Sequence, residues 1–418
     1  MMNISLNYGQ TTYNIDVPDE NLQAILLPDE VLKVPDEAGA IRDALLNPIG
    51  TKKLSEIAVN RKDAVIIVSD ITRPVPSHKL LPPLIDELVA GGLDTEDITI
   101  VFALGSHRNQ TDEEKRRILG DEIFEKIRCI EHDVNDCIQI GRTASGTVVE
   151  IFRPVVEADL RVCTGSIEVH YFAGYTGGLK SILPGVSSMR TIEENHRMLL
   201  QEDARGGNIN GPIRRDIEEA GRMLGVDFIL NVVLNSKKNI VKVVAGDPVE
   251  AHRAGIEVVD RMYKTPVQPS DIVIASAGGY PKDLNLYQAH KALENASNAV
   301  KDGGTLILLA ECMECFANSE FERWLAEADI PRDLLDRLGC EFRIGGHKAA
   351  CIARFLERGE VVLVSSMDDE DVKQAFMRPS ASVAEALDYA LTKHGKDASI
   401  IVIPYGGSTL PVAGGKEN

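Results

Sequence analysis

The feature that most constrains the fold is a repeated alternation of short apolar runs with amphipathic segments. The run 65–68 is followed by 78–90, in which leucine, isoleucine and valine recur at helical spacing. After the next run, 98–104, Thr111 stands three residues before Glu114, the signature of a helix N-terminus. Strands that alternate with helices indicate parallel sheets covered by helices on both faces. The sequence therefore predicts an α/β fold with Rossmann-like, mainly parallel sheets.

The alternation is interrupted near residue 265, which indicates two domains. Pro266 and Pro269 lie there in a polar stretch that is typical of a linker. A chain of 418 residues also suits two or three domains. We expect an N-terminal α/β domain over 1–264, opening with a β-hairpin, and a C-terminal α/β domain over 265–418. Apolar runs restart in the second domain at 272–275, 305–309, 361–364 and 400–403.

The composition excludes several classes of protein. Hydrophobic residues make up 44% and charged residues 26%, as in ordinary globular proteins. The net charge of −19 disfavours nucleic acid and anionic membranes as partners. The first residues do not read as a signal peptide, and no apolar run reaches the roughly 18 residues of a membrane helix. Seven scattered cysteines suit reduced thiols, so we expect a cytoplasmic protein.

Chemically active side chains follow the expected strands directly. Asp70 to Pro74 comes after one strand, Gly105 to His107 after the next, and Gly165 to His170 after a third. Gly278 to Tyr280 follows a strand of the second domain. Ligands of open parallel sheets bind at the carboxyl ends of the strands. We therefore expect these loops to converge on one active site in a cleft between the domains.

Two loop histidines, His107 and His170, are candidates for general bases. Imidazole is the side chain whose ionisation lies closest to neutral pH. Two such bases on opposite sides of a carbon could take and return a proton from either face, which is what a racemase needs. The alternative is that each is an ordinary hydrogen-bonded loop histidine.

A glycine-rich stretch, Gly174 to Gly185, contains Lys180. Glycines let backbone amides approach a ligand closely, and a lysine among them could bind a phosphate or bond covalently to a cofactor. The spacing does not match the phosphate loop of nucleotide hydrolases. The alternative is a glycine-rich turn with a solvated lysine.

The remaining candidates are weaker taken singly. His196 is expected on a helix without a second ligand at i+3 or i+4, so a metal there would take most of its ligands from elsewhere. Gln288 and Lys291 share a helix face and suit a carboxylate, although an ordinary polar face reads the same way. Arg73 could clamp a carboxylate or phosphate, and Asp70 could orient it or bind a sugar hydroxyl.

Together these motifs resemble those of the lactate racemase catalytic subunit family, over nearly the whole chain. Each motif is short, but their order and spacing are specific. The matching segments are Ser69 to Pro74, Gly105 to Arg108, Val169 to Lys180, Asn195-His196 and Tyr287 to Lys291.

The resemblance implies a nickel-pincer nucleotide, a pyridinium-3,5-bisthiocarboxylate mononucleotide that holds Ni(II). It would be covalently attached to Lys180 through a thioamide, with His196 as the nickel ligand from the protein. A pincer with soft sulfur donors plus one imidazole suits square-planar Ni(II). Because other proteins make this cofactor, we expect transient partners among them. The segment implied to contact the cofactor is Asp70, Ile71, Thr72 and Arg73.

The resemblance also implies the reaction. A hydride would leave the alcohol carbon reversibly, with His107 and His170 as the alternating acid/bases. Gln288, Lys291, Tyr287 and Arg73 would contact the substrate. Some lactate-specific relatives carry a tryptophan late in the second domain, whereas 345–354 here has none.

The substrate and even the class of function stay open at this point. Lactate is the first expectation, and malate or a longer aliphatic, aromatic or sugar 2-hydroxy acid is the alternative. A protein that only carries the nickel nucleotide would need Lys180 and His196 but not the paired histidines. A hydrolase with a histidine cluster would work without nickel.

Overall fold

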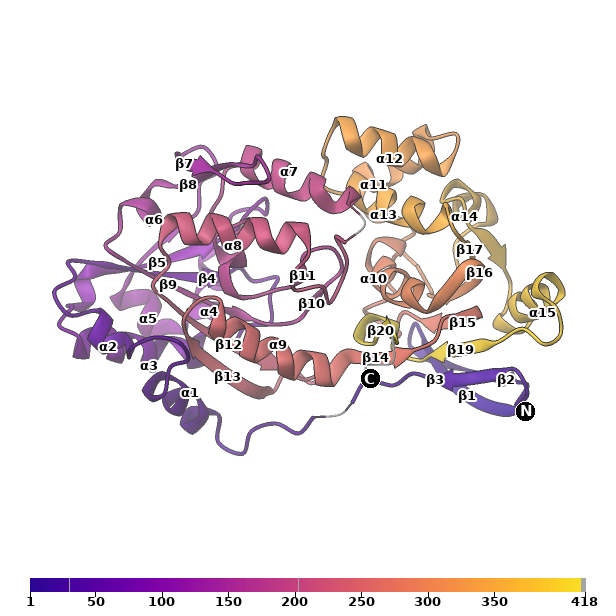
Figure 1. Cartoon of the computed structure of the whole chain (residues 1–418), viewed down its shortest axis with the longest axis horizontal. Helices are drawn as coiled ribbons and strands as arrows, with labels where there is room; N and C mark the ends of the chain where they lie inside the picture. The colour runs from indigo at the N-terminus through magenta and orange to yellow at the C-terminus, as the bar shows by residue number, and fades with distance from the viewer. Residues whose placement is uncertain (30, 202, 415–418) are drawn as a thin grey trace. The chain divides into compact units, whose positions relative to one another are not determined.

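The protein, described here by a computed structural model, divides into two compact units, each with its own parallel sheet (Figure 1). The structure describes residues 1–29, 31–201 and 203–414. We call Glu30–Met262 the central unit, and Met1–Asp29 with Tyr263–Asn418 the terminal unit. The change of unit near residue 263 lies beside the predicted boundary. Residues 1–29, which the sequence predicts to lie in the first domain, instead group with the C-terminal residues.

The central unit is built on a six-stranded sheet in which only one edge strand is antiparallel. Its interior strands are short apolar runs, because a strand covered on both faces has no side that can be polar. Val65, Ile67 and Val101 face one side of the sheet, and Ile66 and Val68 the other. In spatial order the strands are β13 (Ile240–Gly246), β12 (Phe228–Leu234), β9 (Leu160–Ser166), β4 (Ala64–Ser69), β5 (Ile98–Ala103) and β6 (Arg128–Glu131).

Helices cover both sides of this sheet. The apolar stripe of α3 (Ser77–Ala90) packs with α1 (Glu37–Leu46) into the core on one side. Figure 1 shows α8 (Pro212–Leu224) on the opposite side of the strands. The predicted capping box is confirmed, since Thr111 and Glu114 exchange hydrogen bonds at the start of α4 (Asp112–Leu119). The other helices of the unit are α2 (Leu54–Ile57), α5 (Asp121–Lys126), α6 (Arg153–Glu157), α7 (Met189–Arg197) and α9 (Glu250–Tyr263).

The terminal unit has a six-stranded, fully parallel sheet. Its edge strand comes from the N-terminal region, and the hairpin that precedes it buries Ile4, Leu6, Ile15 and Val17 in this unit's core. The alternating pattern predicts such a hairpin but not which sheet buries its apolar face. In spatial order the strands are β18 (Arg378–Ser380), β17 (Glu360–Val364), β16 (Val300–Leu309), β15 (Ser270–Ser276), β19 (Ile400–Ile403) and β3 (Leu22–Ile25).

Smaller elements complete both units. The terminal unit adds α10 (Leu286–Ala296), α11 (Ser319–Glu327), α12 (Pro331–Cys340), α13 (Gly346–Leu356), α14 (Asp369–Gln374) and α15 (Val383–His394). The two-stranded sheets pair β1 (Met2–Tyr8) with β2 (Thr11–Val17), β7 (Cys137–Arg142) with β8 (Val148–Phe152), β10 (Val169–His170) with β11 (Gly174–Tyr175), and β14 (Lys264–Val267) with β20 (Leu410–Ala413).

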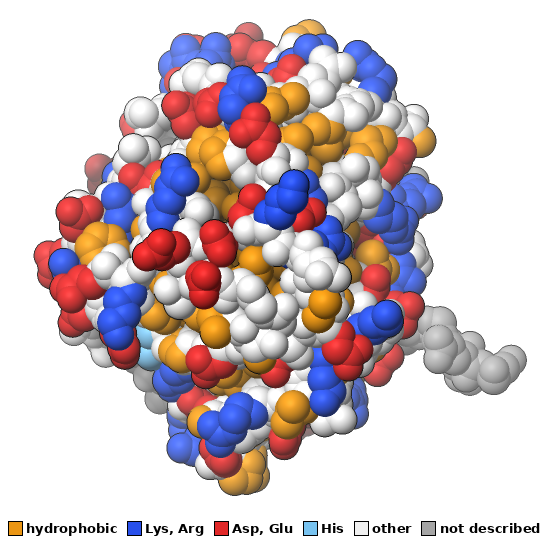
Figure 2. Space-filling view, turned by 90° about the vertical axis from the view of Figure 1, so that its left-hand side faces the viewer, with side chains coloured by type: hydrophobic (Ala, Val, Ile, Leu, Met, Phe, Trp, Pro, Cys, Tyr) orange, Lys and Arg blue, Asp and Glu red, His pale blue; other side chains and the backbone are white. Residues whose placement is uncertain are grey.

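The surface carries both signs of charge. Figure 2 shows one face, on which acidic and basic side chains are interspersed rather than gathered into blocks. Within the described residues, no helix is both long and apolar enough to span a bilayer.

Candidate active site

Three neighbouring parallel strands of the central unit lead into the predicted site loops. Strands β9, β4 and β5 are adjacent, so their carboxyl ends lie at the same edge of the sheet. Asp70 follows β4, His107 follows β5 by four residues, and His170 follows β9 by the same number. The topology therefore brings these three candidates to one edge, as the sequence predicts for loops after parallel strands.

Asp70 and His107 form a hydrogen-bonded pair at this edge. The Asp70 carboxylate is buried, and its Oδ2 contacts Nδ1 of the half-exposed His107 ring. Because the carboxylate oxygen can only accept, Nδ1 carries the proton, and the lone pair of the neutral ring is on Nε2. This is the arrangement that prepares a histidine as a general base. The sequence predicts that Asp70 orients Arg73 or binds a sugar hydroxyl, and its pairing with His107 cannot be inferred from the sequence.

The loop that carries Asp70 is tied down by its own backbone. Oδ1 of Asp70 accepts the Thr72 amide at 3.0 Å and the Thr72 hydroxyl at 2.6 Å. The Ile71 amide donates to Gln110 Oε1 at 2.7 Å, and the Arg73 side chain is exposed. Burial works to raise the pKa of Asp70, but the hydrogen bonds from His107 and Thr72 outweigh it and hold the pKa below its usual value. The carboxylate therefore stays ionised beside the histidine.

His170 lies on the short hairpin β10–β11. Its ring stacks on Tyr171 at 5.1 Å and meets the edge of Phe172 at 4.5 Å between ring centres. The Ala173 amide donates to Nδ1 at 3.3 Å, so a neutral ring carries its proton on Nε2. His107 and His170 thus differ, since one presents a lone pair and the other an N–H at Nε2.

Lys180 lies in a 3-10 turn, Gly178–Ser181, that the fold holds tightly. The Gly178 amide donates to Asn231 Oδ1 at 2.7 Å. At the end of the glycine-rich stretch, the Gly185 carbonyl accepts the Gly105 amide at 2.9 Å. Gly178 has a φ of +56°, and a Cβ there would stand 2.8 Å from the ring of His252. Only glycine fits this position, which fixes the path of the chain two residues before the lysine.

The amine of Lys180 is held in an environment that disfavours its charged form. Burial, with smaller contributions from the cations Arg73 and Arg214, lowers the pKa of Lys180 well below its usual range. Arg214 on α8 is itself buried, and Nε and Nη1 of its guanidinium have no hydrogen-bond partner in the part of the chain that the structure describes. This environment favours the neutral form of the amine, which is the form that acts as a nucleophile.

His196 is on α7, in its last turn, and its ring lies 4.9 Å from Phe172 between centres. Phe172 contacts His170 as well, so one phenyl ring lies against both histidines. Nδ1 of His196 lies 3.1 Å from Oδ1 of Asn195, the residue before it. The structure thus gathers two groups in the central unit: Asp70, Arg73, His107 and Lys180 in one, and His170 with His196 in the other.

The predicted substrate residues Tyr287, Gln288 and Lys291 lie on α10 of the terminal unit. The helix begins where Asn285 accepts the Gln288 amide at 3.0 Å. Lys348 places its ammonium 3.4 Å from the centre of the Tyr287 ring and donates to the Tyr287 carbonyl at 2.7 Å. Burial, assisted by the charge of Lys291, lowers the pKa of Lys348 to about 7. The burial of Lys348 depends on tertiary packing, which the sequence does not reveal.

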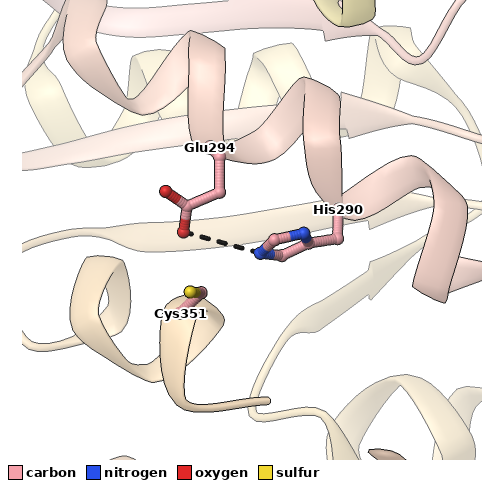
Figure 3. A group of neighbouring side chains, drawn as sticks. All are labelled: His290, Glu294 and Cys351. Carbon is pink, nitrogen blue, oxygen red and sulfur yellow. Dashed lines mark ion pairs between the residues drawn. The ribbon is translucent and has the colours of Figure 1, made fainter. Parts of the chain in front are cut away.

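A buried cluster elsewhere in the terminal unit has the side chains of a metal site but also has neighbouring cations. His290, Glu294 and Cys351 place ligand atoms within 4.8 Å of one another (Figure 3). Glu294 already pairs with Arg354 at 3.1 Å and with His290 at 3.5 Å. A carboxylate compensated by a guanidinium has little charge left for a dication. We interpret the cluster as an internal ion-pair network.

Comparisons with known proteins match the chain in both units. The family model for the lactate racemase N-terminal domain matches residues 8–207, and that for the lactate racemase C-terminal domain matches residues 265–410. A lactate racemase of Thermoanaerobacterium thermosaccharolyticum is 39% identical over 423 residues, covering 98% of this chain and 99% of the relative. A lactate racemase of Lactiplantibacillus plantarum is 35% identical over 419 residues, covering 97% and 99%.

Solved structures agree with the sequence comparisons. The structure of the lactate racemase apoprotein from Thermoanaerobacterium thermosaccharolyticum matches with a TM-score of 0.90 and 38% identity, over 98% of this chain and 100% of that one. A protein from Thermotoga maritima matches with a TM-score of 0.62 and 17% identity, over 92% of this chain and 100% of that one, and shares the fold.

Proposed function

The chain belongs to the lactate racemase family and is an isomerase, and we propose that it interconverts D- and L-lactate or a similar short 2-hydroxy acid. The observation that carries the proposal is the Asp70–His107 pair at the sheet edge that also holds Lys180. A racemase needs a base for the substrate hydroxyl, and His107 has its Nε2 lone pair available for that purpose.

The residues of the central unit fit a covalently attached nickel-pincer nucleotide. The lowered pKa of Lys180 favours the neutral amine that bond formation to a cofactor requires, and Arg73 and Arg214 contribute positive charge near it for an anionic nucleotide. His196 offers an imidazole for nickel. When bound, this cofactor supplies an acceptor for the hydrogen that leaves the alcohol carbon, chemistry that no side chain provides.

We infer that His107 and His170 move the hydroxyl proton. His107 accepts it at Nε2 while Asp70 stabilises the resulting imidazolium through Nδ1–H. His170 serves the opposite enantiomer. For that role its proton must move from Nε2 to Nδ1, which breaks the bond from the Ala173 amide; at 3.3 Å this bond is long and therefore easily given up.

We propose that the carboxylate of the substrate is bound by Arg73, Gln288 and Lys291, with Tyr287 beside them. Guanidinium, amide and ammonium groups all donate to a carboxylate. Lys348 holds the Tyr287 ring and carbonyl and so positions this part of α10. Holding the carboxylate at several points lets the planar 2-oxo acid turn its other face without leaving the protein.

We infer a cytoplasmic enzyme that receives its cofactor from other proteins. All seven cysteines are free thiols, which suits a reducing compartment.

The proposed function is tested by co-expressing the chain with the enzymes that make the cofactor. We expect one nickel per chain, an adduct localised to Lys180 by peptide mass spectrometry, and loss of optical activity from either enantiomer of lactate. A panel of malate and of longer aliphatic, aromatic and sugar 2-hydroxy acids, each as a single enantiomer, identifies the substrate.

The variants His107→Ala and His170→Ala should retain nickel and the adduct but lose turnover. His78→Ala, an exposed histidine at the start of α3, is the matched control and should retain activity. Full turnover in His107→Ala, or an adduct on another lysine, would contradict the proposal. Retention of nickel without activity on any 2-hydroxy acid would favour a cofactor carrier.

A further inference from the structure

We propose that Asn195 and Asp216 are positioning residues that fix His196 in the tautomer whose Nε2 binds nickel. The inference rests on the proposed function, because it takes His196 as the nickel ligand. It concerns a network of buried polar side chains that lies behind the imidazole and takes no part in the acid/base chemistry above.

The centre of the network is the carboxylate of Asp216 on α8. The residue is fully buried, and three side chains donate to its carboxylate. The hydroxyl of Thr143 bonds to Oδ1, and that of Thr147 to Oδ2 at 2.9 Å. The amide of Asn195 also reaches Oδ2, at 2.8 Å. The two threonines flank the turn between β7 and β8, so the network joins three separate elements.

This carboxylate decides which way the Asn195 amide points. Nδ2 of Asn195 faces Oδ2 of Asp216 at 2.8 Å and the carbonyl of Ile213 at 3.4 Å. Both of these oxygens only accept hydrogen bonds, so a flipped amide would set its own oxygen against two acceptors inside a buried site. Oδ1 of Asn195 must therefore face the other way, toward His196.

The amide in turn decides where His196 carries its proton. Oδ1 of Asn195 lies 3.1 Å from Nδ1 of the ring and can only accept. Nδ1 is therefore the protonated nitrogen of the neutral ring, and Nε2 carries the lone pair that a metal requires. A ligand histidine generally donates its second N–H to a fixed acceptor, and removing such an acceptor typically costs about 10- to 100-fold in metal affinity.

A purely structural role makes a different prediction. If the network served only to join α7, α8 and the β7–β8 turn, its loss would lower the melting temperature and leave the tautomer of His196 unchanged. The tautomer itself is therefore the decisive measurement, and it can be made on protein without cofactor.

The first test is long-range ¹H–¹⁵N NMR on histidine-labelled apoprotein, with His196→Gln to assign the signal. We expect the Nδ1–H form in the native protein and a mixture of tautomers in Asn195→Leu. Asp216→Asn should act in the same direction, because an amide at 216 can donate to Asn195 and so permits the flipped orientation. Asn21→Leu removes a similarly buried asparagine, one that bonds carbonyls in the terminal unit, and should leave the His196 signal unchanged.

The second test measures loss of nickel from the loaded protein to a competing chelator. We expect Asn195→Leu and Asp216→Asn to lose nickel about 10- to 100-fold faster than the native protein and the Asn21→Leu control. An unchanged Nδ1–H signal in folded Asn195→Leu would overturn the inference, and so would equal nickel loss. If the native protein bound no nickel, the proposed function would fail, whereas the NMR result would still report on the network.

Discussion

Replacing Asp70 by asparagine should inactivate the enzyme by reversing the tautomer of His107. Oδ1 of Asp70 accepts the Thr72 backbone amide, a donor that cannot turn away. In Asp70→Asn the side-chain oxygen keeps this bond, and the new NH₂ faces Nδ1 of His107. Nδ1 must then accept, so Nε2 carries the proton and cannot act as a base.

The expected fall in kcat follows from the loss of His107 as a general base. A positioned general base contributes about 10²- to 10⁴-fold to a rate, so we expect Asp70→Asn to lower kcat by that range. Asp70→Ala removes the acceptor without introducing a donor, which leaves the ring free to take either tautomer. The alanine variant should therefore retain more activity than the nearly isosteric asparagine variant, the reverse of what size or packing predicts.

The assay needs both enantiomers. Because the two forms of lactate have equal free energies, kcat/KM must fall by the same factor in both directions. Single-turnover experiments separate the two histidines: after acid quench, bound 2-oxo acid should form slowly only from the enantiomer whose hydroxyl His107 deprotonates. Nickel content and the Lys180 adduct are measured in parallel. Equal slowing from both enantiomers at full nickel content, or an alanine variant less active than asparagine, would refute the reasoning.

Two further predictions concern buried bases. In the apoprotein, Lys180 should react with an acylating reagent at pH 7 faster than the exposed Lys237. Arg214→Met should slow this labelling, because it removes a neighbouring cation that lowers the pKa of Lys180. Labelling of both lysines at the same rate would contradict a lowered pKa of Lys180. Burial lowers the pKa of His132 to about 4 from a usual 6.5, so the unfolded chain binds a proton that the folded one does not. Native stability should then fall by about 3 kcal/mol as the pH drops from 6.5 to 4, and urea unfolding of His132→Leu should lack this part of the decline.

Patterns that depend on local periodicity were readable from the sequence. The buried strand runs, the N-terminal hairpin and the capping box at Thr111 are all present in the structure, because each is determined by residues close together in the chain. The meeting of loops at the carboxyl ends of parallel strands also follows from the alternation of strands and helices. The candidate loops after β4, β5 and β9 could be named for the same reason.

Features that depend on tertiary packing could not be predicted from the sequence. Arg214 and Arg215 are adjacent on α8, and only the fold makes the first buried and leaves the second to solvent. Asp216 reads as one more acid on a polar helix, although three donors from other elements surround it. The partnership of Asp70 with His107 links residues 37 apart, and no sequence period encodes it.

The discontinuous make-up of the terminal unit has a consequence for biosynthesis. The hairpin and β3 are synthesised before the central unit, but β19, the neighbour of β3, is synthesised after it. The apolar side chains of the hairpin therefore stay exposed while the whole central unit is synthesised, because the sheet that buries them does not yet exist. Such a nascent chain needs shielding of that early segment, and a transcript cut short before β19 would leave it permanently uncovered.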